Sequence, residues 1–137
     1  MSDLHGFGGN ALAFLVAFVV AGLFTVAFKL IYQWVTPYNE AKLIREGNVA
    51  AALALGGALV GYVLPLASAL SNTVSLVEFC AWAALAGVIQ IAAFSLVRVV
   101  AMKDVAARIE NGEIAAGVYL MSISLAVGLL NAACMTA

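Results

Sequence analysis

Four long apolar runs dominate this 137-residue chain and constrain its fold more than any other feature. They cover roughly residues 11–35, 49–70, 77–101 and 114–135. Each is long enough to cross ~30 Å of hydrocarbon as an α-helix, which takes ~20 mostly apolar residues. None of them alternates polar and apolar residues as a barrel strand does, and a helix bonds its own backbone groups inside the bilayer. The sequence therefore predicts an all-α membrane fold of four transmembrane helices with short loops.

The composition agrees with a chain whose outer surface meets lipid. Hydrophobic residues make up 66% of it and charged residues only 9%, against about 25% charged in a soluble domain. We expect a single membrane domain over residues 1–137, with the lipid bilayer as its first partner. The net charge of −1 excludes a broad basic surface for nucleic acid. Asp3 stands where a signal peptide has positive charge, so the first run is expected to remain as a span.

The basic residues give the orientation. All six lie in or beside the connections between spans 1 and 2 and spans 3 and 4: Lys29, Lys42, Arg45, Arg98, Lys103 and Arg108. Loops rich in Lys and Arg stay on the cytoplasmic side. We therefore predict a multi-pass membrane protein with both basic loops cytoplasmic and both termini on the outer side, which in a bacterium is the periplasm.

Each basic loop has the signals of one short interfacial helix. In the first loop, Thr36 is a candidate N-cap with Pro37 at the first helical position, and Gly47 is a candidate stop. In the second loop, Asp104 is a candidate cap and Gly112 a candidate stop.

The two halves of the chain are related at an offset of 65 residues. The block I-x-x-G-x-x-A-A at residues 44–51 recurs at residues 109–116, at the same point of re-entry into the membrane. We predict repeats over about 11–72 and about 76–137, each a helical hairpin inserted the same way up. This is a parallel repeat, with its pseudo-twofold axis along the membrane normal.

Three sequence blocks, T-P-x-N-E, G-Y-V-x-P-L and N-A-A-C-M-T, lie within residues 36–69 and 111–137. On these blocks, and over nearly its whole length, the chain resembles the YjfL-like family of small bacterial inner-membrane proteins. The resemblance implies four spans built from two copies of a domain of unknown function, with no established activity. It also implies gene neighbours that are phage-shock-like or polyamine-ligase-like, and so a partner in envelope stress.

Polar residues follow one face of span 1 and the equivalent face of span 3, at spacings of three, four and four. In one reading, a candidate functional polar face lines a path through the membrane. In the other, its cations snorkel to the interface while its uncharged groups bond across helices. Gln90 is the sharpest case, because it lies near mid-span and needs a partner on another helix or subunit. The face comprises Thr25, Lys29, Gln33, Gln90 and Arg98, in line with Gly22 and Gly87.

Span 2 has the residues of a close helix contact and a kink. Gly57 and Gly61 form a small-xxx-small face that lets another backbone approach. Pro65 deprives the Gly61 carbonyl of its helix partner, and we expect Tyr62, Ser68 or a neighbouring helix to supply one. Tight packing around a fixed kink and a hinge with an ion-coordinating carbonyl are both open readings.

The predicted periplasmic side carries Asn131, which we group with the packing residues, and the thiols of Cys80 and Cys134. The thiols are expected to be buried and unpaired, although a bridge is open on this side of the membrane. His5 is the single histidine, and no metal-ligand cluster or phosphate-binding loop is visible. We therefore expect no metal, no cofactor and no enzymatic activity.

Spans rich in Ala and Gly present flat faces, so we predict a homo-oligomer, with a dimer favoured. The leading hypothesis is an oligomeric structural or partner-binding component in envelope maintenance or stress. The alternative is a small ion or solute channel or transporter, with a polar path along Thr25–Lys29 and Gln90–Arg98.

Overall fold

The structure is a computed structural model that describes residues 2–101 and 103–135, except for the side chains of residues 2–5, 7 and 101. Helices account for nearly all of the described chain, and no strand occurs in it. In chain order the elements are α1 (Ser2–Val35), α2 (Glu40–Arg45), α3 (Val49–Asn72), α4 (Leu76–Leu96), the π-helix η1 (Val97–Ala101), α5 (Val105–Glu110) and α6 (Ile114–Cys134).

Four helical segments are long and apolar enough to cross a membrane. They are Gly8–Val35, Val49–Asn72, Leu76–Val100 and Ile114–Cys134. Their ends fall within three residues of the predicted spans, so the four-helix prediction is confirmed. Helix α1 continues six residues further toward the N-terminus than its candidate span.

Helices α3 and α6 form the closest contact of the fold, and glycines make it possible. A Cβ atom added to Gly57 would lie 2.6 Å from Met121 Cα, and one added to Gly117 would lie 2.6 Å from the Ala50 carbonyl oxygen. The backbones of Gly61 and Gly128 are also in direct contact. These pairs are separated by close to the 65 residues of the proposed repeat, which itself stays a prediction.

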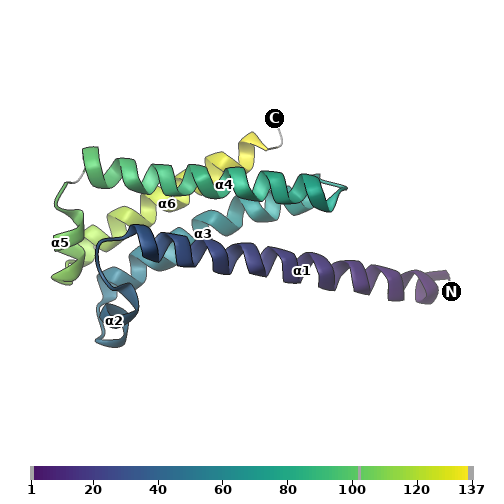
Figure 1. The fold of residues 1–137 in the computed structure, drawn as a ribbon, viewed down its shortest axis with the longest axis horizontal. Helices are drawn as coiled ribbons and strands as arrows, with labels where there is room; N and C mark the ends of the chain where they lie inside the picture. The colour runs from purple at the N-terminus through teal and green to yellow at the C-terminus, as the bar shows by residue number, and fades with distance from the viewer. Residues whose placement is uncertain (1, 102, 136–137) are drawn as a thin grey trace.

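Helix α1 packs on the other spans through its second half only. Its inward face carries Phe24, Phe28 and Tyr32, at spacings of four. Phe24 meets Phe79 edge-on at 6.0 Å, and Tyr32 lies 4.8 Å from the ring of Phe94. The first half of α1 runs on beyond the other helices (Figure 1).

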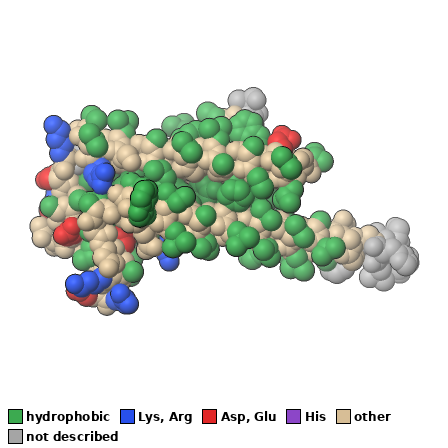
Figure 2. Space-filling model, viewed as in Figure 1, with side chains coloured by type: hydrophobic (Ala, Val, Ile, Leu, Met, Phe, Trp, Pro, Cys, Tyr) green, Lys and Arg blue, Asp and Glu red, His purple; other side chains and the backbone are tan. Residues whose placement is uncertain are grey.

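The short helices α2 and α5 lie at the same end of the molecule, whereas the start of α1 and the end of α6 lie toward the other end (Figure 1). Basic and acidic side chains gather around α2 and α5, whereas the long helices present mostly apolar side chains (Figure 2). We call the end with α2 and α5 the charged end. The structure thus separates the loops from the termini as predicted, while the side that each faces stays a prediction.

The predicted glycine stops and short loop helices are confirmed. Gly47 and Gly112 have φ angles of +86° and +77°, in the left-handed region that favours glycine. Asp104 occupies the cap position of α5, but its side chain accepts no capping hydrogen bond.

The predicted start of the first loop helix is wrong. Helix α2 is capped by Asn39, whose side-chain oxygen accepts a hydrogen bond from Lys42 N at 3.1 Å. Thr36 instead extends the end of α1, because its backbone N–H donates to the Tyr32 carbonyl at 3.0 Å. Pro37 lies in the bend between the two helices.

Candidate functional site

The polar residues predicted on span 1 lie outside the contact that α1 makes with the other spans of the same chain. The Thr25 hydroxyl donates to the Ala21 carbonyl of its own helix at 2.9 Å. Lys29 is exposed and Gln33 is half-buried. The face of α1 that packs inward is the neighbouring aromatic one, so the polar residues lie beside the helix contact instead of inside it.

Two side-chain amides join α4 to α6. Gln90 is 5% exposed, and its Nε2 donates to the Ser124 carbonyl at 3.3 Å. Asn131 Nδ2 donates to the Ala86 carbonyl at 3.3 Å. Gln90 Oε1 is buried without a partner in the described part of the chain. Both amides therefore act within a buried helix contact, which is the interhelical role weighed for Gln90.

Arg98 ties the end of α4 to the end of α1. It lies in the π-helix η1, and its Nη1 donates to the Val35 carbonyl at 3.3 Å. Val35 is the last residue of α1, where backbone carbonyls have no helical partner. A cation at this position also suits the negative end of the helix dipole.

The region around Pro65 is closely packed, and of the three expected partners for the Gly61 carbonyl only the neighbouring helix lies against it, at Gly128 of α6. The Tyr62 hydroxyl donates to the Ala83 carbonyl of α4 at 3.0 Å, and the Ser68 hydroxyl donates to the Ala132 carbonyl of α6 at 3.1 Å. Each hydroxyl has one proton to donate, so neither serves the Gly61 carbonyl. Their bonds hold α3 against its two neighbours instead.

The charged end contains a buried carboxyl group that sequence reasoning missed. Glu40, the first residue of α2, is 2% exposed, and neither carboxyl oxygen has a hydrogen-bond partner among the described residues. The hydroxyl of Tyr38 is buried and unpartnered in the same way. Burial without a partner is costly for a carboxylate, so the neutral form is favoured.

The electrostatics of this group follow from its burial. Burial raises the pKa of Glu40 to about 8, although the Thr36 hydroxyl and the charge of Lys29 both act to lower it. Burial and the carboxyl of Glu40 together raise the pKa of Tyr38 well above its usual value. The nearby Tyr32 hydroxyl lowers the pKa of Tyr38, Glu110 raises it and Arg98 lowers it. Near neutral pH, therefore, Glu40 holds a proton at the charged end.

The signal for Glu40 was present in the sequence as part of the T-P-x-N-E block. An acidic residue directly after an N-cap Asn is ordinarily a solvated first-turn residue, which complements the helix dipole. Its burial instead accompanies the packing of α2 against α3.

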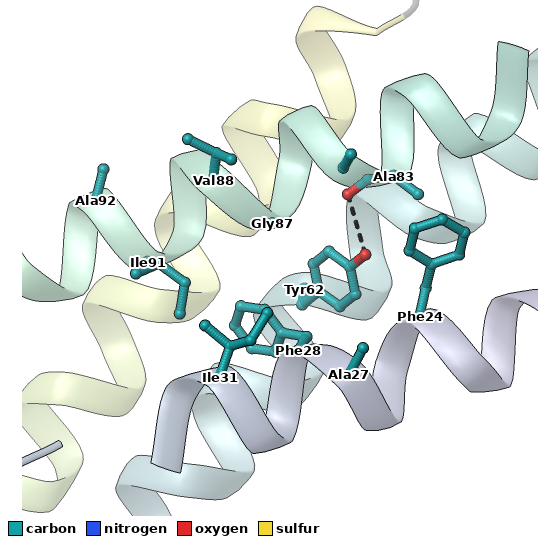
Figure 3. Close-up of a pocket in the computed structure, with 11 residues that line it drawn as sticks. Phe24, Ala27, Phe28, Ile31, Tyr62, Ala83, Gly87, Val88, Ile91 and Ala92 are labelled. Carbon is teal, nitrogen blue, oxygen red and sulfur yellow. Dashed lines mark hydrogen bonds between the residues drawn. The ribbon is translucent and has the colours of Figure 1, made fainter. Parts of the chain in front are cut away.

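An apolar groove of about 560 Å³ lies between α1 and α4 (Figure 3). Tyr62 of α3 lies in it beside Phe28, with its hydroxyl turned toward Ala83 (Figure 3). Ile31 and Ile91 approach it from the two flanking helices (Figure 3). The groove offers hydrocarbon contacts to a ligand and almost no hydrogen-bonding groups.

The remaining candidates are not brought together. Cys80 is half-buried, Cys134 is exposed, and both thiols are free. The prediction that both are buried is thus wrong for Cys134, which lies on the outer surface of α6. The side chain of His5 lies outside the described residues. Among the side chains that the structure describes, no three of His, Cys, Asp or Glu are grouped as metal ligands.

Known proteins resemble this chain over almost its full length. Residues 3–135 match the family described as Domain of Unknown Function (DUF350). The chain is 43% identical over 127 residues to the UPF0719 inner membrane protein YjfL of Escherichia coli strain K12, covering 93% of this chain and 96% of that protein. It is 28% identical over 135 residues to the UPF0719 transmembrane protein YshE of Bacillus subtilis strain 168, covering 97% and 98%. No solved structure matches. The resemblance inferred from the sequence blocks is confirmed.

Proposed function

This chain belongs to the DUF350 family, and we propose that it is an oligomeric structural or partner-binding component of the bacterial inner membrane, acting in envelope maintenance or stress. The observation that carries the proposal is the exposure of α1. Only 6% of the residues in an 18-residue window of its candidate span are buried, against 56% in such a window of α3. A span that contributes so little to its own bundle has most of its surface available to another helix.

The first half of α1 offers a defined contact face. Phe14 and Phe18 are 66% and 68% exposed, and their rings stack with centroids 6.2 Å apart. Helices associate in lipid by van der Waals packing, since the hydrophobic effect gives no net drive there. Paired rings supply a large rigid area for such packing. We propose a second copy of this chain as the partner, in a dimer.

The proposed topology places α2 and α5 in the cytoplasm and both termini in the periplasm. It is supported by the gathering of the basic side chains at one end of the molecule (Figure 2). The proposed role in envelope stress rests on the family resemblance alone.

The rival function, a small channel or transporter, has less support. Its path would need Gln90 and Arg98 to face water, but each donates to a backbone carbonyl of a neighbouring helix. Thr25 is likewise bonded within its own helix.

The deciding experiment measures the oligomeric state of the protein in lipid nanodiscs by single-molecule photobleaching. We expect two copies per disc for the wild type and one for the Phe14→Ala/Phe18→Ala variant. The matched control is Leu129→Ala/Leu130→Ala on α6, where both leucines are also exposed. One copy for the wild type, or two for the α1 variant, would contradict the proposal.

A flux assay separates the two functions. Purified protein in liposomes should pass K⁺, Na⁺ and protons no faster than empty liposomes do. Flux above that level that is abolished by Gln90→Leu would support the channel and refute the structural role as the sole function.

A further inference from the structure

The groove between α1 and α4 is suited to hydrocarbon. Its lining side chains are apolar throughout, apart from the hydroxyl of Tyr62, which donates its hydrogen bond to the Ala83 carbonyl. Its volume of about 560 Å³ lies in the range of sites that hold small molecules. Because it opens on the lipid-facing side of two spans, its natural occupant comes from the bilayer. It is also separate from the Phe14–Phe18 face, which lies further toward the N-terminus.

A cation lies beyond the groove at the charged end. Val35 is one helical turn past Ile31, and Arg98 is six residues, or about 9 Å of helix, past Ala92. The hydrogen bond from Arg98 to the Val35 carbonyl joins the two helices there. A guanidinium has five N–H groups, so this bond leaves most of them for another acceptor.

An interfacial aromatic residue lies at the same level. Trp34 follows Ala27 and Ile31 at spacings of four and three, so it shares the groove side of α1. Its side chain is 85% exposed. Tryptophan is enriched where lipid headgroups begin, and Trp34 therefore places Arg98 at headgroup depth.

We propose that this groove is a binding site for one anionic phospholipid, with an acyl chain between α1 and α4 and the headgroup phosphate on Arg98. A phosphate suits the charge and the donor geometry of a guanidinium. A second copy of the chain suits the groove less well. Under a twofold axis along the membrane normal, it would bring its own Arg98 and Lys29 to the same level, where like charges repel.

The test titrates delipidated, detergent-purified protein with phosphatidylglycerol or phosphatidylcholine and counts bound lipid by native mass spectrometry. We expect one tight phosphatidylglycerol per chain and weaker phosphatidylcholine binding. Arg98→Gln should weaken phosphatidylglycerol binding about fivefold, the effect of one cation near an anionic lipid, and phosphatidylcholine binding by less, because choline offsets the charge of its phosphate. Arg98→Lys, which keeps the charge, should retain the preference for the anionic lipid.

Filling the groove tests whether the acyl chain of the lipid binds there. Ala92→Trp adds bulk to the groove wall and should reduce binding of both lipids, whereas Ala126→Trp on the exposed side of α6 should not. Equal binding of the two lipids by wild type and Arg98→Gln would overturn the proposal. So would a dimer that dissociates on Ala92→Trp without loss of bound lipid, because a second copy would then occupy the groove.

Discussion

The ring of Phe28 on α1 lies flat on the ring of Tyr62 on α3, with centroids 4.4 Å apart and planes 12° apart. The hydroxyl of the same tyrosine donates to the Ala83 carbonyl on α4. Tyr62 thus joins three of the four spans with one side chain. Because α1 has few other buried contacts, its attachment to the bundle depends strongly on this stack.

We predict that Phe28 and Tyr62 are energetically coupled. A double-mutant cycle of Phe28→Leu and Tyr62→Leu should give a coupling of about 0.5–1.5 kcal/mol, the value of a stacked pair beyond its buried area. Unfolding by sodium dodecyl sulfate in mixed micelles would measure the free energies. Tyr62→Phe keeps the ring and should cost only about 0.6 kcal/mol for the lost interhelical bond. Additive effects of the two leucine substitutions would contradict the coupling.

Adjacent glycines on α3 should respond in opposite ways to the same substitution. In Gly57→Ala the new Cβ would lie 2.6 Å from Met121 Cα, so α3 and α6 must separate, at a cost of about 1–3 kcal/mol. In Gly56→Ala the new Cβ meets nothing within 4 Å, and helix propensity favours alanine by up to about 1 kcal/mol. The same unfolding assay compares them. Equal losses for both would show that α3 and α6 do not approach this closely.

The spans could be predicted because bilayer thickness sets the length of each apolar run, whatever the run packs against. The loop helices could be predicted because Gly47 and Gly112 supply the left-handed residue that ends a helix. Both signals are local in the sequence. The cap of α2 is local too, but Thr36 and Asn39 are both good caps, and the end of α1 decided between them.

The packing faces were harder to predict, for a physical reason. In a soluble helix the apolar face is the buried one, whereas in lipid both faces are apolar. The polar stripe through Thr25 and Lys29 was therefore the face predicted to matter, although Phe28, next to Lys29 in the sequence, makes the contact with α3. The burial of Glu40 depends on tertiary structure and has no periodic signal.

Gln90 should contribute little to stability, despite its position in the core. Gln90→Leu removes one bond to the Ser124 carbonyl, but it also removes the unpartnered Oε1 from a buried site. The gain and the loss oppose each other, so we expect a change below about 1 kcal/mol in the free energy of unfolding. Gln90→Glu should lower the free energy of unfolding several times more, because it places an ionisable group where the amide donated to the Ser124 carbonyl. A large loss for the leucine variant would indicate a further partner for Oε1, such as a bound water.

Glu40 should make the protein less stable as pH rises. Its pKa is about 8 in the folded protein and 4.5 in its ordinary state, so between these values the folded form holds a proton that the unfolded form has released. Stability is therefore complete below about pH 4.5, falls up to about pH 8 and is level above it. The loss has an upper limit of about 5 kcal/mol, at ~1.4 kcal/mol per pKa unit.

Thermal unfolding in detergent from pH 5 to pH 9 should show this decline for the wild type, and Glu40→Gln, which stays neutral, should largely remove it. Glu46→Gln, at an exposed position just after α2, is the matched control and should follow the wild type. Parallel curves for wild type and Glu40→Gln would show that the carboxyl ionises in the folded protein at its ordinary pKa, and would contradict the prediction.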